Sequence, residues 1–265
     1  MHHGPNFWHL LIALLALSLI FSAVERLFAA NPGQPRWRSD VKTDIGYWFI
    51  TALLTKPATQ LIIGFSLMLA YHANVAELRE MVTHRDTLVT HQPLWAQALE
   101  MVFLGDLIGY WTHRMFHSRR LWKFHAVHHC SIELDWLSAV RLHPINDWVS
   151  RAIAVITLFA LGFGPLALAA YVPFLTFYAI MLHANVNWSF GPLGKFIASP
   201  VFHRWHHTSQ EEGLDRNFAG LFSFIDRIFG TYYMPEGKVP QRFGLHNEQI
   251  PRNIWGQMIY PFRSS

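Results

Sequence analysis

Histidine is concentrated in three short clusters of this 265-residue chain, which read HRMFH (113–117), HAVHH (125–129) and HRWHH (203–207). On a helix, residues three or four apart lie on one face, so each cluster presents two or three imidazoles together. Neutral imidazole is a ligand for Zn, Cu, Fe and Ni. Because one zinc ion takes four ligands, eight clustered histidines predict a site for two metal ions.

A metal-free role, or a metal site of another kind, fits the clusters less well. Without metal, eight adjacent rings would have to stay neutral with paired nitrogens, or repel one another on protonation. The Glu-x-x-His pairs of soluble di-iron bundles and the H-E-x-x-H protease motif do not occur. With a single cysteine, Cys130, the chain offers neither a disulfide framework nor a deaminase zinc site. No Gly-rich phosphate loop or G-x-S-x-G motif is present.

The order H-x3-H, H-x2-HH and a distant H-x2-HH resembles the fatty acid hydroxylase/sterol desaturase superfamily of membrane di-iron enzymes. The segments LWKFHAVHHCS, SPVFHRWHHTS and DRNFAGLFSFIDRIFGTYYMP carry the same likeness, which extends over about residues 100–235. The resemblance implies eight metal ligands: His113, His117, His125, His128, His129, His203, His206 and His207. It adds His183 as a further ligand, and His143 as either a ligand or a residue beside the substrate or the ligands.

Two polar residues are candidates for orienting the ligands. Asp106 precedes His113 by seven residues, two turns along the same helix face, and would hold an imidazole by a hydrogen bond. A bond from Asp106 to a neighbouring helix is the alternative. Asn187 follows His183 by one turn and would bind metal weakly or through water. Asn217, Asp226 and Arg227 resemble family positions that brace the third cluster, although surface polar positions would look the same.

The function implied by the resemblance is an O2-dependent non-haem di-iron oxidoreductase that hydroxylates or desaturates an unactivated C–H bond of a lipid or sterol-like substrate. The cofactors would be two iron ions, with zinc able to replace them in a preparation, and O2 would be the co-substrate. The chain lacks a haem or flavin module, so a soluble or membrane electron-transfer protein must act as external donor. A membrane protein that handles or transports metal is the alternative. Transport favours ligands along the spans, whereas these clusters follow the spans on one side.

Composition indicates a membrane protein. Hydrophobic residues make up 52% of the chain and charged residues 14%, against about 25% charged in soluble domains. The net charge is +4. The Lys and Arg residues are scattered beside apolar runs, which suits cytoplasmic loops and lipid headgroups and argues against nucleic acid as a partner.

The apolar runs predict helices over 6–24, about 58–76 and about 93–112, each near the ~20 residues that cross a bilayer. Lys56 and Pro57 interrupt the second run. Since a lysine at mid-bilayer costs about 2.5–3.5 kcal/mol, we expect that span to start at Pro57. Residues 149–188 predict a membrane hairpin that bends at Gly164-Pro165 inside the bilayer and returns to its own side.

We therefore expect an all-α integral membrane helical bundle with a cytosolic, histidine-rich di-metal cap. Residues 1–112 would form the spanning helices. Residues 113–265, including the hairpin, would form the di-iron catalytic region as one structural unit with the spans. Positive loop charge places the active site on the cytoplasmic side.

Overall fold

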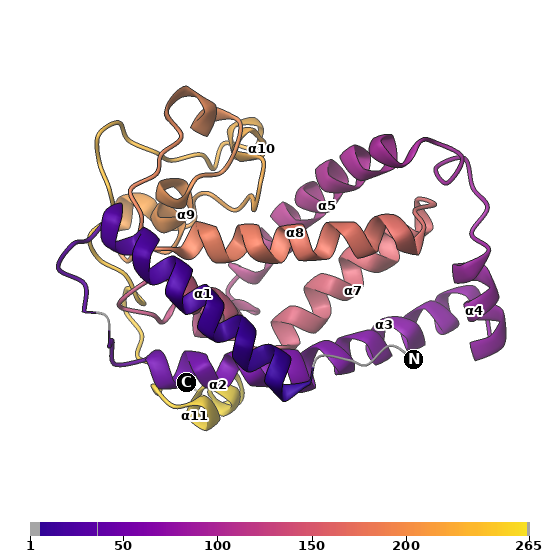
Figure 1. The fold of residues 1–265 in the computed structure, drawn as a ribbon, viewed down its shortest axis with the longest axis horizontal. Coiled ribbons are helices and arrows are strands. Elements are labelled where there is room, and N and C mark those ends of the chain that lie inside the picture. Colours follow the sequence, from indigo (N-terminus) through magenta and orange to yellow (C-terminus); the bar gives the residue numbers. More distant parts are fainter. Residues whose placement is uncertain (1–5, 36, 264–265) are drawn as a thin grey trace.

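The chain folds into helices joined by loops (Figure 1). The computed structural model describes residues 6–35 and 37–263, with only the backbone for 165–172. Small parts of the two expected domains lie outside the described residues, namely residues 1–5, Arg36 and residues 264–265. Within the described ranges there is no β-strand, and only two isolated bridges occur, Ala29 with Val186 and Thr208 with Phe243. The all-α prediction is confirmed.

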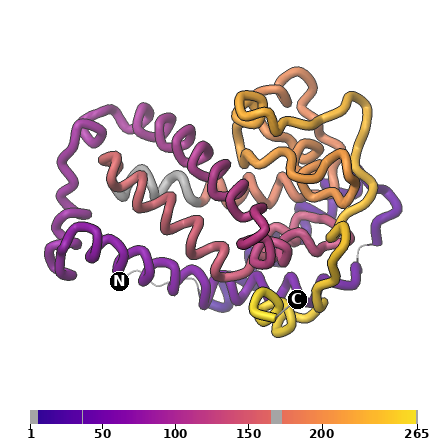
Figure 2. Tube along the Cα trace, turned by 180° about the vertical axis from the view of Figure 1, so that it is seen from behind, coloured from indigo at the N-terminus to yellow at the C-terminus, as the bar shows by residue number. Residues whose placement is uncertain are grey.

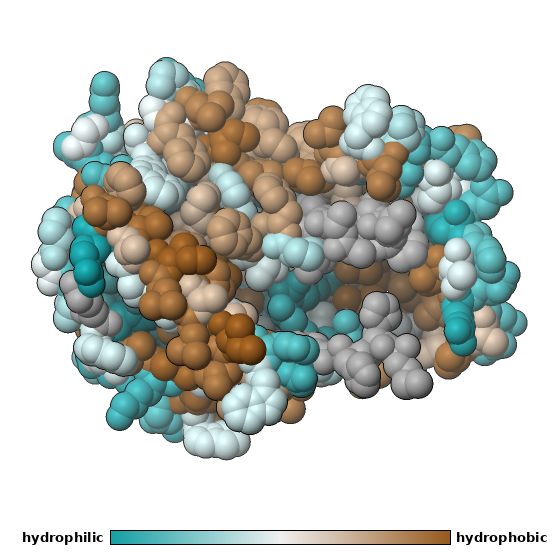
Figure 3. All heavy atoms as spheres, viewed as in Figure 1, coloured by the Kyte–Doolittle hydropathy of each residue, from teal (hydrophilic) through white to brown (hydrophobic). Residues whose placement is uncertain are grey.

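The first candidate membrane helix is α1 (Phe7–Leu27), which overlaps the predicted span 6–24. The side chain of Asn6 caps it by accepting the N–H of His9 at 2.9 Å. Its outer side chains are apolar and exposed, Leu19 to 76%, and Figure 3 shows hydrophobic surface along this helix. Glu25 joins α1 to the rest of the fold by accepting the N–H groups of Trp136 and Asn185 at 3.1 and 2.9 Å.

The second candidate membrane helix begins earlier than expected, because the predicted span started at Pro57. α2 (Val41–Ile50), the π-helix η1 (Thr51–Thr55) and α3 (Lys56–Tyr71) form one rod of 31 residues, Val41–Tyr71. Pro57 has no N–H and its ring would clash with a regular preceding turn. The chain instead widens by one residue before it, so that the Lys56 N–H donates to Thr51 O. Lys56 therefore lies in the middle of the rod.

After α4 (Val75–Thr83) the chain enters α5 (Leu94–Phe116), which overlaps the expected third span. By length and composition α5 is not among the candidate membrane helices of the described residues. It packs against α7 (Pro144–Ala160) and α8 (Pro165–His183). Asp106 on α5 faces protein, because its side chain is buried. Because α5 continues through residue 112 into the first histidine cluster, a continuous helix joins the two expected domains.

The hairpin of α7 and α8 bends where Gly and Pro predicted. Gly162 adopts a φ of +100°, which favours glycine, and Pro165 begins α8. The bend is not free within the bundle: Thr87 Oγ1 donates to Gly162 O at 2.7 Å, and Arg85 Nη2 donates to Phe159 O at 2.5 Å. It therefore lies at the same end as the loop between α4 and α5, at the right of Figure 1. Because α7 and α8 both extend from the cap to this end of the bundle, we now predict that the bend lies at the far surface of the bilayer and not inside it.

At the opposite end of the hairpin, the segment between α5 and α7 and the residues after His183 form a cap over the ends of α5 and α8 (Figures 1 and 2). The cap contains the short helices α6 (Trp122–His129), α9 (Pro200–His206) and α10 (Ser223–Ile228), with 3-10 turns at η2 (Trp136–Val140), η3 (Gly191–Lys195) and η4 (Glu211–Gly213). The chain then returns to α11 (Ile254–Ile259) and η5 (Tyr260–Phe262), and α11 lies against α2.

Candidate metal centre

The fold brings the three histidine clusters and the end of α8 together. The first cluster ends α5, the second lies on α6 and the third on α9. The side-chain nitrogens form two groups, and within each group they lie within 4.8 Å of one another. The first group is His113, His117, His125, His129 and His206; the second is His128, His183, His203 and His207. Nine of the ten predicted histidines are in these groups.

Each cluster on α6 and α9 supplies both groups. We expected His125, His128 and His129 to share one broad face, but α6 divides them, because neighbouring helical residues point about 100° apart. His128 joins the second group while its neighbours in the cluster join the first. The two groups are contiguous, since the rings of His129 and His207 stack with centroids 4.3 Å apart.

Hydrogen bonds at Nδ1 orient the rings of the first group. His113 Nδ1 lies 2.8 Å from Phe218 O, and His206 Nδ1 lies 2.7 Å from Arg216 O. A carbonyl oxygen only accepts, so Nδ1 must donate in both rings. In the neutral ring Nε2 then carries a lone pair that is directed toward the other ligands.

Two side chains do the same for two further rings of that group, His125 and His117. His125 Nδ1 lies 2.7 Å from Asn146 Oδ1, and His117 Nδ1 lies 2.9 Å from Asp215 Oδ1. The hydrogen bond from His117 lowers the pKa of Asp215 below its usual value, so this carboxylate stays ionised. Carboxylate or amide partners of this kind fix the orientation of a metal-binding imidazole.

Two rings of the second group are held at Nδ1 in the same way, whereas the Nδ1 atoms of His203 and His207 have no hydrogen-bond partner among the described residues. His128 Nδ1 lies 2.9 Å from Arg141 O, and His183 Nδ1 lies 2.7 Å from Ala179 O. The Nε2 atoms of His128 and His183 are 3.1 Å apart. His203 Nε2 lies 3.2 Å from that of His183 and 3.1 Å from that of His207.

These contacts fit bound cations. Where both rings of a pair donate from Nδ1, their Nε2 atoms face each other as two lone pairs, 3.0 Å apart for His113 and His125. Such a pair is repulsive unless a cation lies between. Nitrogens bound to one metal at about 2.0–2.1 Å are themselves about 3.0–3.4 Å apart. The Nε2 atoms of His117, His129 and His206 are buried without a hydrogen-bond partner among the described residues, which is costly for a polar atom without a ligand.

The surroundings keep the rings in the ligating form. Burial lowers the pKa well below the usual value for the six histidines of α6 and the third cluster, and neighbouring imidazoles lower it further. The six are His125, His128, His129, His203, His206 and His207. Neutral imidazole is the form that binds metal, so protons compete weakly for these nitrogens at neutral pH.

Three predicted site residues lie apart from both groups. His143 caps the N-terminus of α7, accepting the Ile145 N–H at Nδ1 (3.2 Å), while its Nε2 lies 3.2 Å from Met258 O. Asn187 is exposed, and its backbone N–H donates to Phe28 O at 2.9 Å. Asp106 makes no hydrogen bond to a histidine. It accepts the N–H groups of residues 220, 221 and 222 at 2.6–2.9 Å and so acts on His113 only through the loop that contains Phe218.

The expected bracing residues of the tail contact this same loop and α9. Asp226 accepts the N–H groups of Phe218 and Ala219 at 2.7 and 2.8 Å. Asn217 Nδ2 donates to Phe202 O on α9 at 2.9 Å. Arg227 lies over the ring of Tyr232, 4.4 Å from its centroid. Asn217 and Asp226 thus hold the carbonyl of residue 218 and the helix of the third cluster in place.

Sequence reasoning missed Asn146 and Asp215, which contact ligand rings directly, and the ion pairs that hold Arg141. The Arg141 guanidinium is buried and donates from Nε to Asp44 Oδ1 at 2.5 Å. These partners are 21 to 98 residues from the groups they hold, so no local spacing reveals them. Only Asn146 had a signal in the sequence that could have revealed it: it is a polar residue in the first turn of a helix that begins with His-Pro.

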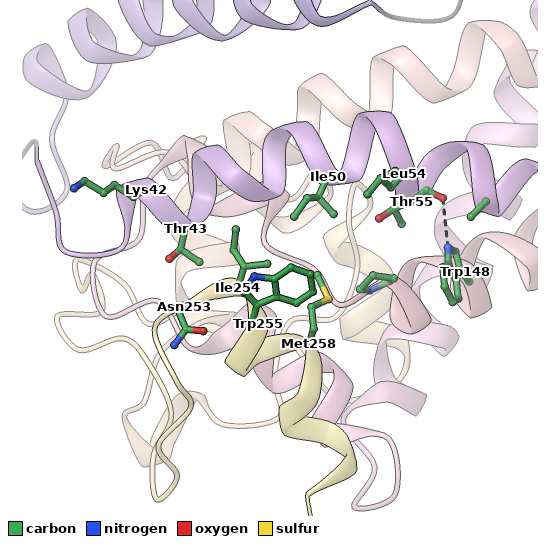
Figure 4. A pocket seen from close by; sticks show the side chains of 12 residues that line it. Lys42, Thr43, Ile50, Leu54, Thr55, Trp148, Asn253, Ile254, Trp255 and Met258 are labelled. Atoms are coloured by element: carbon green, nitrogen blue, oxygen red, sulfur yellow. Dashed lines mark hydrogen bonds between the residues drawn. The ribbon is translucent and has the colours of Figure 1, made fainter.

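An apolar pocket of about 660 Å³ lies between the rod 41–71, the start of α7 and α11 (Figure 4). Ile50, Leu54, Trp148 and Met258 line its apolar part, and Lys42 lies at one end. Trp148 lies two residues beyond Asn146, which holds His125. Only about half a turn of α7 therefore separates the residue that holds His125 from a residue that lines the apolar pocket.

Two contiguous groups of histidines directed at one another have the donor set of a histidine-rich metal centre. Comparison with known proteins specifies the class. The family model described as fatty acid hydroxylase matches residues 98–231, and the chain belongs to that family. The match covers the first and second clusters, the hairpin and the third cluster.

Curated relatives come from several branches. Ornithine lipid hydroxylase OlsE of Rhizobium tropici is 28% identical over 95% of this chain and 75% of its own length. Human alkylglycerol monooxygenase is 32% identical over 52% of this chain and 31% of its own. The Delta(7)-sterol 5(6)-desaturase ERG3A of Gibberella zeae is 27% identical over 57% of this chain and 42% of its own. The match thus spans less than half of the latter two. No solved structure matches. Family membership and the relatives support an oxidoreductase, and the two candidate membrane helices suggest a membrane protein.

Proposed function

We propose that the protein is a membrane-bound di-iron oxygenase that uses O2 to hydroxylate, or to desaturate, an unactivated C–H bond of a lipid or sterol-like substrate. The observation that carries the proposal is the pair of contiguous histidine groups whose Nε2 atoms converge. The hydroxylase, monooxygenase and desaturase names of the relatives support the reaction class.

The balanced reaction explains why side chains alone are insufficient. Hydroxylation combines R–H, O2, two electrons and two protons into R–OH and water. A C–H bond in a lipid chain has no acidic proton and no leaving group, so general acid–base catalysis has nothing to act on. Two irons, when bound, would supply the redox chemistry with O2, and the external donor would supply the two electrons.

The residues of the chain would hold and shield that centre. The first group would hold one iron and the second group the other. Asn146, Asp215 and the carbonyls of residues 141, 179, 216 and 218 hold the Nδ1 atoms of six of the nine rings and direct their Nε2 atoms inward. Burial of the rings keeps water away from the reacting atoms.

The position of the centre supports a lipid substrate. His183 ends α8 and His113 lies near the end of α5, so the groups lie where long apolar helices meet the cap. A lipid chain can reach such a site from the bilayer, while a donor protein reaches it from the other side. A transporter would need ligands along the helices, and in the described structure both groups lie at one end (Figure 1).

The test is incorporation of oxygen from 18O2. Cells that express the protein, or its His129→Ala variant, are grown under 18O2 and their lipids compared by mass spectrometry. We expect a lipid that gains one 18O atom, or loses two hydrogens, only with the unmodified protein. Identical lipid profiles in both strains would contradict the proposal, provided that the unmodified protein is present and carries its metal.

A further inference from the structure

A positive charge lies inside the second candidate membrane helix. Lys56 is the sixteenth of 31 residues in the rod Val41–Tyr71 and directly follows the π-helix η1. It is half-buried and forms no hydrogen bond or ion pair with any described residue. An ionisable residue at such a depth is expensive and is a functional-site candidate by default.

The neighbouring helix adds a second cation and only one anion. On α7, Asp147 is buried, and both of its oxygens are occupied: Oδ1 accepts Arg151 Nε at 2.7 Å, and Oδ2 accepts Thr59 Oγ1 at 3.1 Å. Lys56 lies within the electrostatic range of both Asp147 and Arg151. Two cations therefore share one carboxylate, and the cluster of Lys56, Thr59, Asp147 and Arg151 keeps a surplus positive charge.

This cluster lies beside the candidate metal centre. Asn146, which holds His125, is the residue before Asp147 on α7. Arg151 lies five residues after Asn146 on α7, which is about 7.5 Å along the helix axis at 1.5 Å per residue. A polar group held by Arg151 would therefore lie near the turn of α7 that holds His125.

We propose that Lys56 and Arg151 bind the phosphate or carboxylate of an anionic membrane lipid. That this lipid is the substrate rests on the proposed function; the binding itself does not. Arg151 would make charge-assisted hydrogen bonds from the side of its guanidinium that Asp147 leaves free, and Lys56 would add a point charge. Because Lys56 lies in a candidate membrane helix, the shared anionic chemistry comes from a lipid rather than from a free ion.

The binding test uses the full-length protein purified in detergent, with phosphatidylglycerol and phosphatidylcholine added in equal amounts. Native mass spectrometry measures how much of each lipid the protein retains, and metal content is measured on the same sample. The unmodified protein should prefer phosphatidylglycerol. Lys56→Met should weaken that lipid's binding about tenfold, Lys56→Arg should preserve it, and Arg79→Met on the exposed surface of α4 is the control that should change nothing.

Asp147→Asn should strengthen lipid binding, which a merely damaged fold would not do. It removes the shared negative charge and keeps one acceptor oxygen, which can still bind Arg151, so phosphatidylglycerol should bind more tightly. Full retention by Lys56→Met, or loss only with Lys42→Met in the apolar pocket, would overturn the proposal. Displacement of the lipid by excess inorganic phosphate would show a free-anion site and overturn the lipid assignment. If the variants change lipid binding as expected but the unmodified protein has no oxygenase activity, only the proposed function is contradicted.

Discussion

His128 and His183 bring their Nε2 atoms to 3.1 Å from each other although 55 residues separate them. Each ring donates its Nδ1 proton to a backbone carbonyl, so the facing nitrogens both carry lone pairs. This contact joins the second histidine cluster to the end of the hairpin. A cation between the two rings would remove the repulsion, and we therefore propose His183 as a ligand that the three clusters alone would not provide.

Replacing His183 should therefore cost metal at the second group. In His183→Ala we expect the metal content to fall from about two ions per chain toward one, because three imidazoles remain where four converged. The matched control is Asn187→Ala, one turn later, whose residue is exposed. Elemental analysis of the two purified variants makes the comparison. Unchanged metal in His183→Ala, or equal loss in both variants, would remove His183 from the ligand set.

The Asn146 amide should matter through His125. Asn146→Leu removes the acceptor at 2.7 Å from His125 Nδ1, so the ring loses its fixed tautomer and orientation. We expect metal affinity about 10- to 100-fold lower, which is typical when such a partner is lost. Asn146→Asp keeps an acceptor and should preserve most of the affinity. Competition with a metal chelator measures both. Equal affinities in Asn146→Leu and the unmodified protein would mean that packing alone orients His125.

Acid should unfold the metal-free protein steeply. The six histidines with a pKa well below the usual value stay neutral when folded, whereas in the unfolded chain they protonate near pH 6.5. Below that pH the unfolded state binds more protons, so the free energy of unfolding falls as pH falls. Each ring contributes up to about 1.4 kcal/mol per pH unit. Chemical denaturation between pH 7.5 and 5.5, at roughly half-unit steps, measures the slope.

Metal should protect against this acid sensitivity, since a bound ion competes with protons for Nε2. The control is the metal-loaded protein over the same pH range, where the slope should be smaller. A flat stability profile for the metal-free protein would show that the rings are not held neutral, and would contradict the orientation argued from the Nδ1 partners.

The bend of the hairpin should be accessible from outside the cell. Leu161 is 50% exposed next to the bend that packs on the loop of Thr87. In a Cys130→Ser background, Leu161→Cys should react with a membrane-impermeant thiol reagent from the same side as Leu88→Cys, which is 88% exposed. Leu193→Cys in the cap, 58% exposed, should react only after the membrane is opened. Labelling of Leu161→Cys together with Leu193→Cys would place the bend on the cytoplasmic side.

The parts of the site that the sequence predicts depend on short spacings. The i, i+4 pairs His113/His117 and His125/His129 lie on single helices, so helical geometry alone brings their rings into one group. Gly164-Pro165 predicts the bend for the same local reason. The resemblance to a family added His183, which the structure places in the second group.

The parts that could not be predicted depend on contacts between distant segments. Asp215 reaches His117 across 98 residues, and its backbone takes a positive φ of 53° that no pattern announced. The α-helix α3 begins at Lys56 with Pro57 in its first turn, as expected, but the candidate span begins earlier, because a π-turn joins α3 to α2 without breaking the rod. The insertion cost expected for Lys56 assumes lipid around its side chain, whereas Asp147 and Arg151 of α7 are its charged neighbours.

Iron content tests the central claim most directly. Mössbauer spectroscopy of the purified 57Fe-loaded protein, with protein concentration from amino-acid analysis, gives both the number and the environment of the irons. We predict about two non-haem irons per chain, nitrogen-ligated and magnetically coupled as neighbours. A single iron per chain, haem iron, or two irons that behave as isolated ions would contradict the account of two contiguous histidine groups.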